Sequence, residues 1–98
     1  MEDSDFLIAK NYALKLLSYR PRSIHEVKKK LKNYLFKKNL SSSLEEKIIN
    51  YLIGLNLLND ADFAAWWVMQ RKNITIKGKK IVRFELLSKG VSKEIIDQ

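Results

Sequence analysis

The chain has 98 residues, no cysteine, and 19 lysines and arginines against 11 acidic residues, which gives a formal net charge of +8. A chain of this length holds one small domain or two very small ones, and without cysteine it forms neither disulfides nor thiolate metal sites. Its apolar stretches, such as residues 63–69, are far too short to cross a bilayer, and the acids after Met1 are unlike a secretory signal, so we expect a cytoplasmic protein.

The positive charge indicates a polyanionic partner. Nucleic acid is the commonest partner of this kind, and an acidic protein surface is the other candidate. The plain alternative is a solvated basic surface that binds nothing, because net charge favours solubility by itself.

Helical periodicity runs along the chain, which contains one proline and three glycines and shows no strand alternation. A first helix should begin at a cap within residues 3–5 and end by Tyr19, because Pro21 disfavours a helical residue before it. A second helix follows a capping box, in which the Ser23 hydroxyl accepts from the amide of Glu26 and the Glu26 carboxylate accepts from the amide of Ser23. The residues predicted to face inward on these two helices are Ala9, Ala13, Leu16, Leu17, Val27, Leu31, Tyr34 and Leu35.

The same spacing of serine and glutamate recurs at Ser43 and Glu46, which predicts a second capping box and a third helix that ends near Gly54. A fourth helix is expected from about Asn59 or Asp60 to about Arg71. The inward residues of these helices should be Ile48, Ile49, Leu52 and Phe63.

Residues 72–77 are expected to form a loop. Gly78 should precede a fifth helix, which should end at Gly90. Val82 and Leu86 should face inward on it. Ser92 can cap a sixth helix of under two turns, a length that is marginal in isolation. The apolar face that begins with Ile95 and Ile96 lacks a continuation, so we expect a fragment of a longer protein, with a naturally short chain as the alternative.

An internal repeat relates the two halves of the chain, since residues 12–20 resemble residues 63–71 and residues 46–49 resemble residues 93–96. The predicted fold is therefore all-α, with tandem three-helix repeats and a truncated last helix. The first repeat would span residues 1–55, and an incomplete second repeat would span residues 56–98. Because units of this size need a neighbour to pack against, the molecule should be elongated and curved.

Catalytic residues are hard to find. The one histidine, His25, lies in the first capping box, where a solvent-facing role is the common one. Residues 41–43 suit a loop and cap, and no Gly-rich phosphate loop, HExxH sequence or paired acid motif occurs. We therefore expect a protein that is not an enzyme and that needs no cofactor or metal.

Cations are the better candidates for a functional site. Arg20 and Arg22 flank a proline in a rigid turn, where arginine can form forked bonds to carboxylate or phosphate. The alternative for Arg20 and for its counterpart Arg71 is a structural ion pair at the seam between helices, which would leave Arg22, Lys79, Lys80 and Arg83 freer to bind. The full set of predicted partner-binding or DNA-binding residues is Arg20, Arg22, Lys28, Lys32, Arg71, Lys77, Lys79, Lys80 and Arg83.

Aromatic residues are expected mainly in the core. Trp66 and Trp67 lie about 100° apart around a helix, so both need not be buried equally. We expect Trp67 to be core and Trp66 to be partly exposed, as a possible interface anchor. The other aromatic residues predicted to be core are Phe6, Tyr12, Tyr34 and Phe63.

Three segments resemble motifs of the RecX family and occur in the order that the family has. They are residues 13–23 with Glu26-Val27 and Lys30-Leu31, residues 57–64 with Trp67 and Arg71, and Lys77-Gly78 with Glu85-Leu86 and residues 89–91. The resemblance covers about residues 9–96. The chain departs from the pattern at Val27, where leucine is usual, and in the extra tryptophan of residues 65–67.

The resemblance implies a tandem of three-helix repeats, usually three, that binds the RecA nucleoprotein filament. RecX proteins inhibit strand exchange and ATP hydrolysis by RecA, in DNA repair, recombination and the SOS response. A steric mechanism is implied, in which a rigid, monomeric body lodges in the filament groove. The chain shows the first repeat and most of the second.

A direct DNA-binding module is the alternative function, because short basic three-helix units are similar to helix-turn-helix domains. The helix expected over residues 23–38 would then be the basic helix. Its charges are mostly lysines, which favour phosphate contact over base readout. Binding to single-stranded or double-stranded DNA would therefore have low sequence preference.

Overall fold

The computed structural model describes residues 4–71 and 76–97, with the backbone alone at residues 76 and 77. Every regular element in this part of the chain is a helix, which confirms the predicted all-α class. The helices are α1 (Ser4–Tyr19), α2 (Ile24–Lys37), α3 (Leu44–Gly54), α4 (Asp60–Met69), α5 (Ile76–Ser88) and α6 (Lys93–Ile96).

The predicted loop over residues 72–77 is wrong at its C-terminal end, because α5 already begins at Ile76. Gly78 lies inside α5 rather than before it; a helical glycine costs only about 1 kcal/mol relative to alanine, which the rest of a helix can offset. Residues 72–75 lie outside the described part of the chain.

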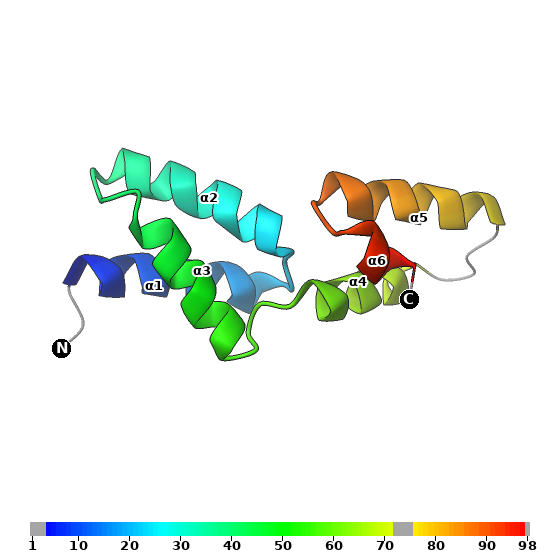
Figure 1. Ribbon diagram of the computed structural model, residues 1–98, viewed down its shortest axis with the longest axis horizontal. Coiled ribbons are helices and arrows are strands. Elements are labelled where there is room, and N and C mark those ends of the chain that lie inside the picture. The colour runs from blue at the N-terminus through cyan, green and yellow to red at the C-terminus, as the bar shows by residue number, and fades with distance from the viewer. Residues whose placement is uncertain (1–3, 72–75, 98) are drawn as a thin grey trace.

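The helices form two groups of three that lie end to end (Figure 1). Helices α1, α2 and α3 pack on one another, and α4, α5 and α6 do the same. In Figure 1, α1 and α4 follow one edge of the molecule, while α2 and α5 follow the other. The extents of 50 × 24 × 23 Å confirm an elongated shape.

Short polar side chains begin three of the helices as predicted. The Ser23 capping box is complete, Asn59 accepts from the amide of Asp62 at 3.1 Å, and the Ser92 hydroxyl accepts from the amide of Ile95 at 3.4 Å. These bonds satisfy amides that have no partner inside their own helix.

The second predicted capping box is wrong. Ser43 has helical backbone angles (φ −64°, ψ −19°) and its side chain makes no cap bond. Its hydroxyl instead lies 2.8 Å from that of Ser41, and the amide of Leu44 already donates to the carbonyl of Ser41 at 3.2 Å. The helical turn therefore starts ahead of Ser43, so this serine is not in the extended conformation that a capping side chain needs.

Helices α2, α3 and α5 end in the same left-handed turn, formed by Asn39 (φ 56°), Asn56 (φ 57°) and Gly90 (φ 84°). In each case the next amide donates to the carbonyl five residues back, and the three bonds are Leu40 to Leu35 at 2.9 Å, Leu57 to Leu52 at 2.9 Å, and Val91 to Leu86 at 3.1 Å. This pattern is the Schellman motif. It confirms Gly90 as a stop, whereas in α3 the left-handed residue is Asn56 and not the terminal Gly54.

Each group of helices has its own apolar core. The first contains Ala9, Ala13, Val27, Leu31, Leu35, Leu44, Ile48, Ile49, Leu52 and Leu58. The second is smaller and contains Phe63, Ala64, Val82, Leu86 and Val91. The inward faces predicted from helical periodicity are thereby confirmed at most positions, while Leu17, Tyr34, Ile95 and Ile96 are half-buried against these cores.

The aromatic predictions are confirmed only in part. Phe63 is 1% exposed, whereas Phe6, Tyr12 and Tyr34 are half-buried at the edge of the first core. Tyr12 and Tyr34 stack with ring centroids 3.9 Å apart, which joins α1 to α2. Trp67 is half-buried like Trp66, so the expected contrast between a core and a partly exposed tryptophan is wrong. These large rings lie at the rims of small cores that cannot enclose them.

We predict that Leu31→Ala and Leu86→Ala each lower the free energy of unfolding by about 2–5 kcal/mol, because both side chains are buried and truncation leaves a cavity. Urea unfolding followed by circular dichroism measures the loss. Leu55→Ala is the matched control, since this leucine is 53% exposed and should change stability by less than about 1 kcal/mol. A loss at Leu31 or Leu86 no larger than that of the control would contradict the assignment of that core.

Candidate partner-binding surface

The N-terminus of α2 is the point where the two groups of helices meet. Ser23 is fully buried, and its hydroxyl donates to the carbonyl of Lys89 at 2.7 Å while it accepts from the amide of Glu26. The amide of Ile24 donates to the carboxylate of Asp60, at the start of α4, at 2.8 Å. These bonds join residues far apart in sequence, so the cap of α2 also fixes the position of the second unit.

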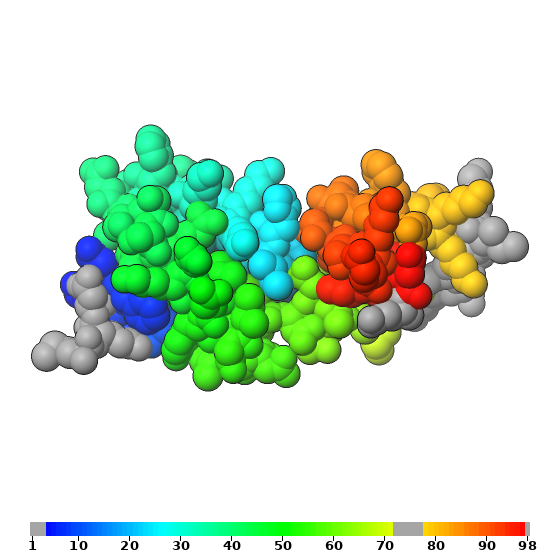
Figure 2. All heavy atoms as spheres, viewed as in Figure 1, coloured from blue at the N-terminus to red at the C-terminus, as the bar shows by residue number. Residues whose placement is uncertain are grey.

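In Figure 2 the end of α5, in orange, lies beside the start of α2, in cyan. Gly90 makes this approach possible. A Cβ atom built on Gly90 would lie 2.4 Å from the Cβ of His25, which is too close for any side chain. Glycine is therefore required twice at this position, for its positive φ and for the close approach to His25. The lone histidine thus has a packing contact in the junction.

Glu26 is the acidic residue that pairs with the basic side chains at the junction. Its carboxylate pairs with Arg20 at 2.7 Å and with Lys89 at 3.4 Å, and it accepts from the amide of Ser23 at 3.1 Å. Partial burial raises the pKa of Glu26, but the hydrogen bond from Ser23 and the hydrogen bond and charges of Arg20 and Lys89 outweigh it, so that the pKa lies below its ordinary value. The carboxylate is thus held ionised between cations from both units.

Arg20 and Arg71 both make the structural ion pairs that were the alternative to a binding role. Arg20 pairs with Glu26 and lies 6.0 Å from the ring centroid of Trp66, whereas Arg71 pairs with Glu85 and lies 5.7 Å from that of Trp67. The acid follows its arginine by six residues in one unit and by fourteen in the other. The repeat therefore preserves the arginine while the acid differs, and both tryptophans belong to α4, so the contact of Arg20 with Trp66 joins the two units. A direct role of these arginines in partner binding stays a prediction.

The expectation that Arg22 and Arg83 are free is wrong. Arg22 is half-buried, and its Nε donates to the carbonyl of Leu16 at 2.9 Å, which satisfies a terminal carbonyl of α1. Arg83 pairs with Asp97, and this hydrogen bond raises the pKa of Arg83 and lowers that of Asp97. The acid that engages Arg83 lies fourteen residues away and beyond the turn at Gly90, so helical spacing gave no sign of it.

Lysines supply the unpaired cations. Lys79 and Lys80 are exposed on α5 and make no ion pair within the described part of the chain. The side chain of Lys77 lies outside the described residues. Lys28 and Lys32 are exposed on α2, which also carries exposed lysines at Lys29, Lys30 and Lys37, followed by Lys38. The predicted site residues whose side chains the structure describes therefore divide into arginines engaged in the fold and lysines at the surface.

Exposed apolar side chains accompany these lysines, and sequence analysis missed them. On α5, Ile81, Phe84 and Leu87 are 53%, 71% and 36% exposed and follow one another at three-residue spacing, on the side away from the core. On α2, Phe36 is 86% exposed. The available signal was that these positions fall outside the inward periodicity of their helices. A surface that mixes lysine with large apolar groups suits a protein partner better than phosphate alone.

The described residues contain no group of three or more histidine, aspartate or glutamate side chains placed to hold a metal ion. None of the described helices has the length and apolar character of a membrane span.

The fold and surface define an all-helical tandem of three-helix units joined by a polar junction. Family models match both units in order: the first three-helix domain of RecX matches residues 9–52, and the second matches residues 59–98. The chain therefore belongs to the RecX family, which confirms the resemblance found in its motifs.

Similar proteins and similar solved structures support the same family assignment. The chain is 38% identical to the regulatory protein RecX of Halalkalibacterium halodurans over 89% of the chain and 31% of the relative, and 37% identical to that of Mycobacteroides abscessus over 86% and 39%. It is similar to the crystal structure of RecX from Lactobacillus salivarius, with a TM-score of 0.81 and 33% identity over 96% of this chain and 58% of that one. The chain spans about a third of the length of the curated relatives it matches.

We predict that the stabilising effect of Glu26 disappears in acid. Because its pKa is lower in the folded protein than in the unfolded chain, the unfolded state binds more protons as the pH falls below about the ordinary value of 4.5, and stability declines until the folded pKa is passed. Glu26→Gln should therefore melt below the wild type at pH 7, with a difference that narrows toward pH 3.

Thermal melts of both proteins across this pH range measure the effect. Glu46→Gln is the control, because it removes an exposed carboxylate of the first unit that makes no ion pair among the described residues. A difference between wild type and Glu26→Gln that stays constant from pH 7 to pH 3 would show that the charge of Glu26 does not stabilise the junction.

Proposed function

We propose that this protein is a cytoplasmic regulator, and not an enzyme, that binds the RecA nucleoprotein filament and inhibits its recombinase and ATPase activities. The observation that carries the proposal is the match of both RecX three-helix domains, in order, to the two units of the elongated body. The relatives that share these domains are named regulatory proteins. The part played by RecA rests on the family resemblance.

The proposed mechanism is steric and depends on the junction. The two units are joined by the buried Ser23, by Asp60 and by the contact of Gly90 with His25, and in this mechanism they would move together as one body. A body of this kind, lodged in the filament groove, would oppose the movement of filament subunits that ATP hydrolysis and strand exchange require. Because the junction orders the units before binding, little conformational entropy is lost when the partner is bound.

Direct contacts to the filament are assigned to the exposed lysines Lys28, Lys32, Lys79 and Lys80, and to Lys77. The arginines Arg20, Arg22, Arg71 and Arg83 would act mainly by holding the helices that present these lysines, because each is engaged within the fold. We also propose that the first repeat spans residues 1–55 and the second spans residues 56–98, and that the protein acts as a monomer.

We predict that Lys79→Glu combined with Lys80→Glu weakens inhibition of ATP hydrolysis by a RecA filament on single-stranded DNA. Both side chains are exposed and unpaired in the described structure, so helical content should not change, while reversed charges would repel an acidic surface or DNA phosphate. The expected rise in the concentration for half-inhibition is about tenfold or more. Lys15→Glu combined with Lys47→Glu is the charge-matched control on the first unit.

Arg20→Ala separates structure from contact in the same assay. It removes one of the two cations that pair with Glu26, so it should lower the melting temperature more than it lowers inhibition. If the Lys79 and Lys80 double reversal inhibits like the wild type, these lysines are not part of the contact. If the wild-type chain neither binds the filament nor inhibits it, the proposed function of this chain is wrong.

Direct DNA binding is the second candidate function, and the observation that favours it is the row of exposed lysines on α2. We predict weak binding to DNA with low sequence preference and a log affinity that falls with log salt by about 0.9 for each phosphate contacted in a duplex. Lys28→Gln combined with Lys32→Gln should flatten this slope by up to about two such contacts. Fluorescence anisotropy at several salt concentrations measures it, and an affinity that does not change with salt would exclude phosphate contact.

A further inference from the structure

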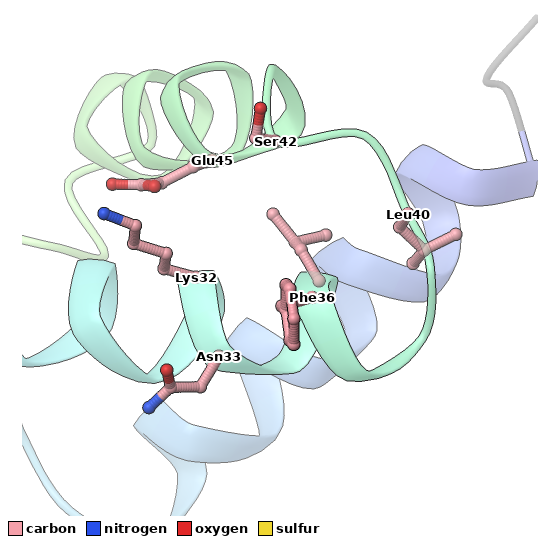
Figure 3. A pocket seen from close by; sticks show the side chains of 7 residues that line it. Lys32, Asn33, Phe36, Leu40, Ser42 and Glu45 are labelled. Carbon is pink, nitrogen blue, oxygen red and sulfur yellow. The ribbon is translucent and has the colours of Figure 1, made fainter.

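A pocket of about 310 Å³ lies where α2 ends and α3 begins. Its lining comes from the last turns of α2, from the connecting turn and from the start of α3, and consists of Lys32, Asn33, Leu35, Phe36, Leu40, Ser42 and Glu45. Figure 3 shows Phe36 and Leu40 beside the hollow, with the charged ends of Lys32 and Glu45 at its rim. In Figure 1 this corner of the first unit points away from the second unit.

Phe36 lies at the surface and is not part of the core of its unit. It is 86% exposed, the highest value among the exposed large hydrophobic residues of the described chain. Covering an aromatic ring of this kind contributes about 1.5–3 kcal/mol. An exposed ring beside an apolar pocket is the arrangement that a partner's apolar side chain can complete.

The surroundings of the pocket define the charge of that partner. Lys32 lines the pocket, Lys37 and Lys38 follow Phe36 directly, and these lysines are exposed. Glu45 is the one acidic residue in the lining. A segment that places an apolar side chain in the pocket would therefore carry carboxylates on either side of it, where they meet the lysines.

We propose that this pocket binds an acidic protein segment through one apolar anchor, a side chain of phenylalanine, leucine or methionine size. The volume is at the lower end of the range for ligand pockets, which suits one anchor side chain rather than a cofactor. The proposal deepens the proposed function, because it specifies the chemistry of the protein surface that the first unit contacts.

Nucleic acid fits the pocket less well than protein. A base that entered it would leave ring nitrogens and carbonyl groups next to Leu35, Phe36 and Leu40, and unpaired polar groups are costly to bury. A second copy of this chain is disfavoured as the occupant, because each copy carries a net charge of +8.

The test uses the 98-residue chain and a fluorescent acidic peptide with one central phenylalanine. A second peptide carries alanine at that place, and an oligothymidine competitor represents single-stranded nucleic acid. Anisotropy titrations should show binding of the phenylalanine peptide, at least tenfold weaker binding of the alanine peptide, and no competition by oligothymidine that depends on Phe36.

Phe36→Ala should weaken peptide binding about tenfold or more. Tyr19→Ala is the matched control, since it removes an aromatic ring that is 69% exposed and does not line the pocket, and its affinity should equal that of the wild type. Because both side chains are exposed, both variants should keep wild-type helical content. Lys32→Glu should weaken binding at low salt, and the effect should shrink at high salt.

Three outcomes would overturn the proposal: equal affinities for the two peptides, wild-type peptide affinity in Phe36→Ala, or displacement of the peptide by oligothymidine in a manner that requires Phe36. The last would identify a nucleic-acid site. Filament inhibition is measured separately on the same proteins. Peptide binding by the wild type without inhibition would contradict the proposed function and keep the pocket, whereas inhibition by the wild type without peptide binding would contradict only the pocket.

Discussion

The hydrogen bonds at the N-terminus of α2 hold the two units together. A helix start has amides without partners, and here they are satisfied by side chains from two parts of the chain: Ser23 and Glu26 nearby, and Asp60 from α4. Ser23 then uses its hydroxyl hydrogen for the carbonyl of Lys89, at the end of α5. A local cap and a contact between units are therefore the same set of atoms, and the start of α2 cannot fray without loosening the junction.

Charge reinforces this junction. Glu26 alone would be an unfavourable, partly buried carboxylate, but it is neutralised by Arg20 from its own unit and by Lys89 from the other. Both tryptophans contact these charged side chains. Trp66 lies under Arg20, while Trp67 lies near Lys89 and donates a hydrogen bond to Glu85 at 3.3 Å. Neither core is large, so the ion pair of Glu26 with Lys89 and the contact of Arg20 with Trp66 add to the hydrogen bonds that join the units, whereas the Trp67 contacts lie within the second unit.

Sequence was most informative where short-range rules decide the structure. The Ser23 capping box, the stop at Gly90 and the inward faces of α2 and α5 all follow from residues within two turns of one another. It was misleading at Ser43, where the sequence pattern is right but the backbone is already helical. The local pattern predicts which side chain can cap a helix, but it does not predict the backbone conformation that the preceding turn gives to that residue.

The partners of the arginines could not be predicted for a different reason. Arg22 bonds a carbonyl six residues away across a proline turn, and Arg83 bonds an acid beyond the end of its helix. Both contacts depend on how a helix end meets the segment that follows it, which composition and periodicity do not contain. The exposure of Phe36 could have been predicted, because it falls outside the inward periodicity of α2, but the pocket beside it depends on the turn between α2 and α3.

The two units repeat their cores while their outer surfaces differ. Helix α2 presents lysines with one exposed phenylalanine at its end, whereas α5 presents Ile81, Phe84 and Leu87 beside Lys80. A partner that contacted both surfaces would have to match a basic region and an apolar region. The junction joins these two regions along a body 50 Å long. Because neither surface has to be ordered when the other binds, contacts that are weak one at a time can combine without a further loss of conformational freedom. The buried cap of α2 thus does more than start its own helix, since it helps to set the distance and the angle between the two surfaces.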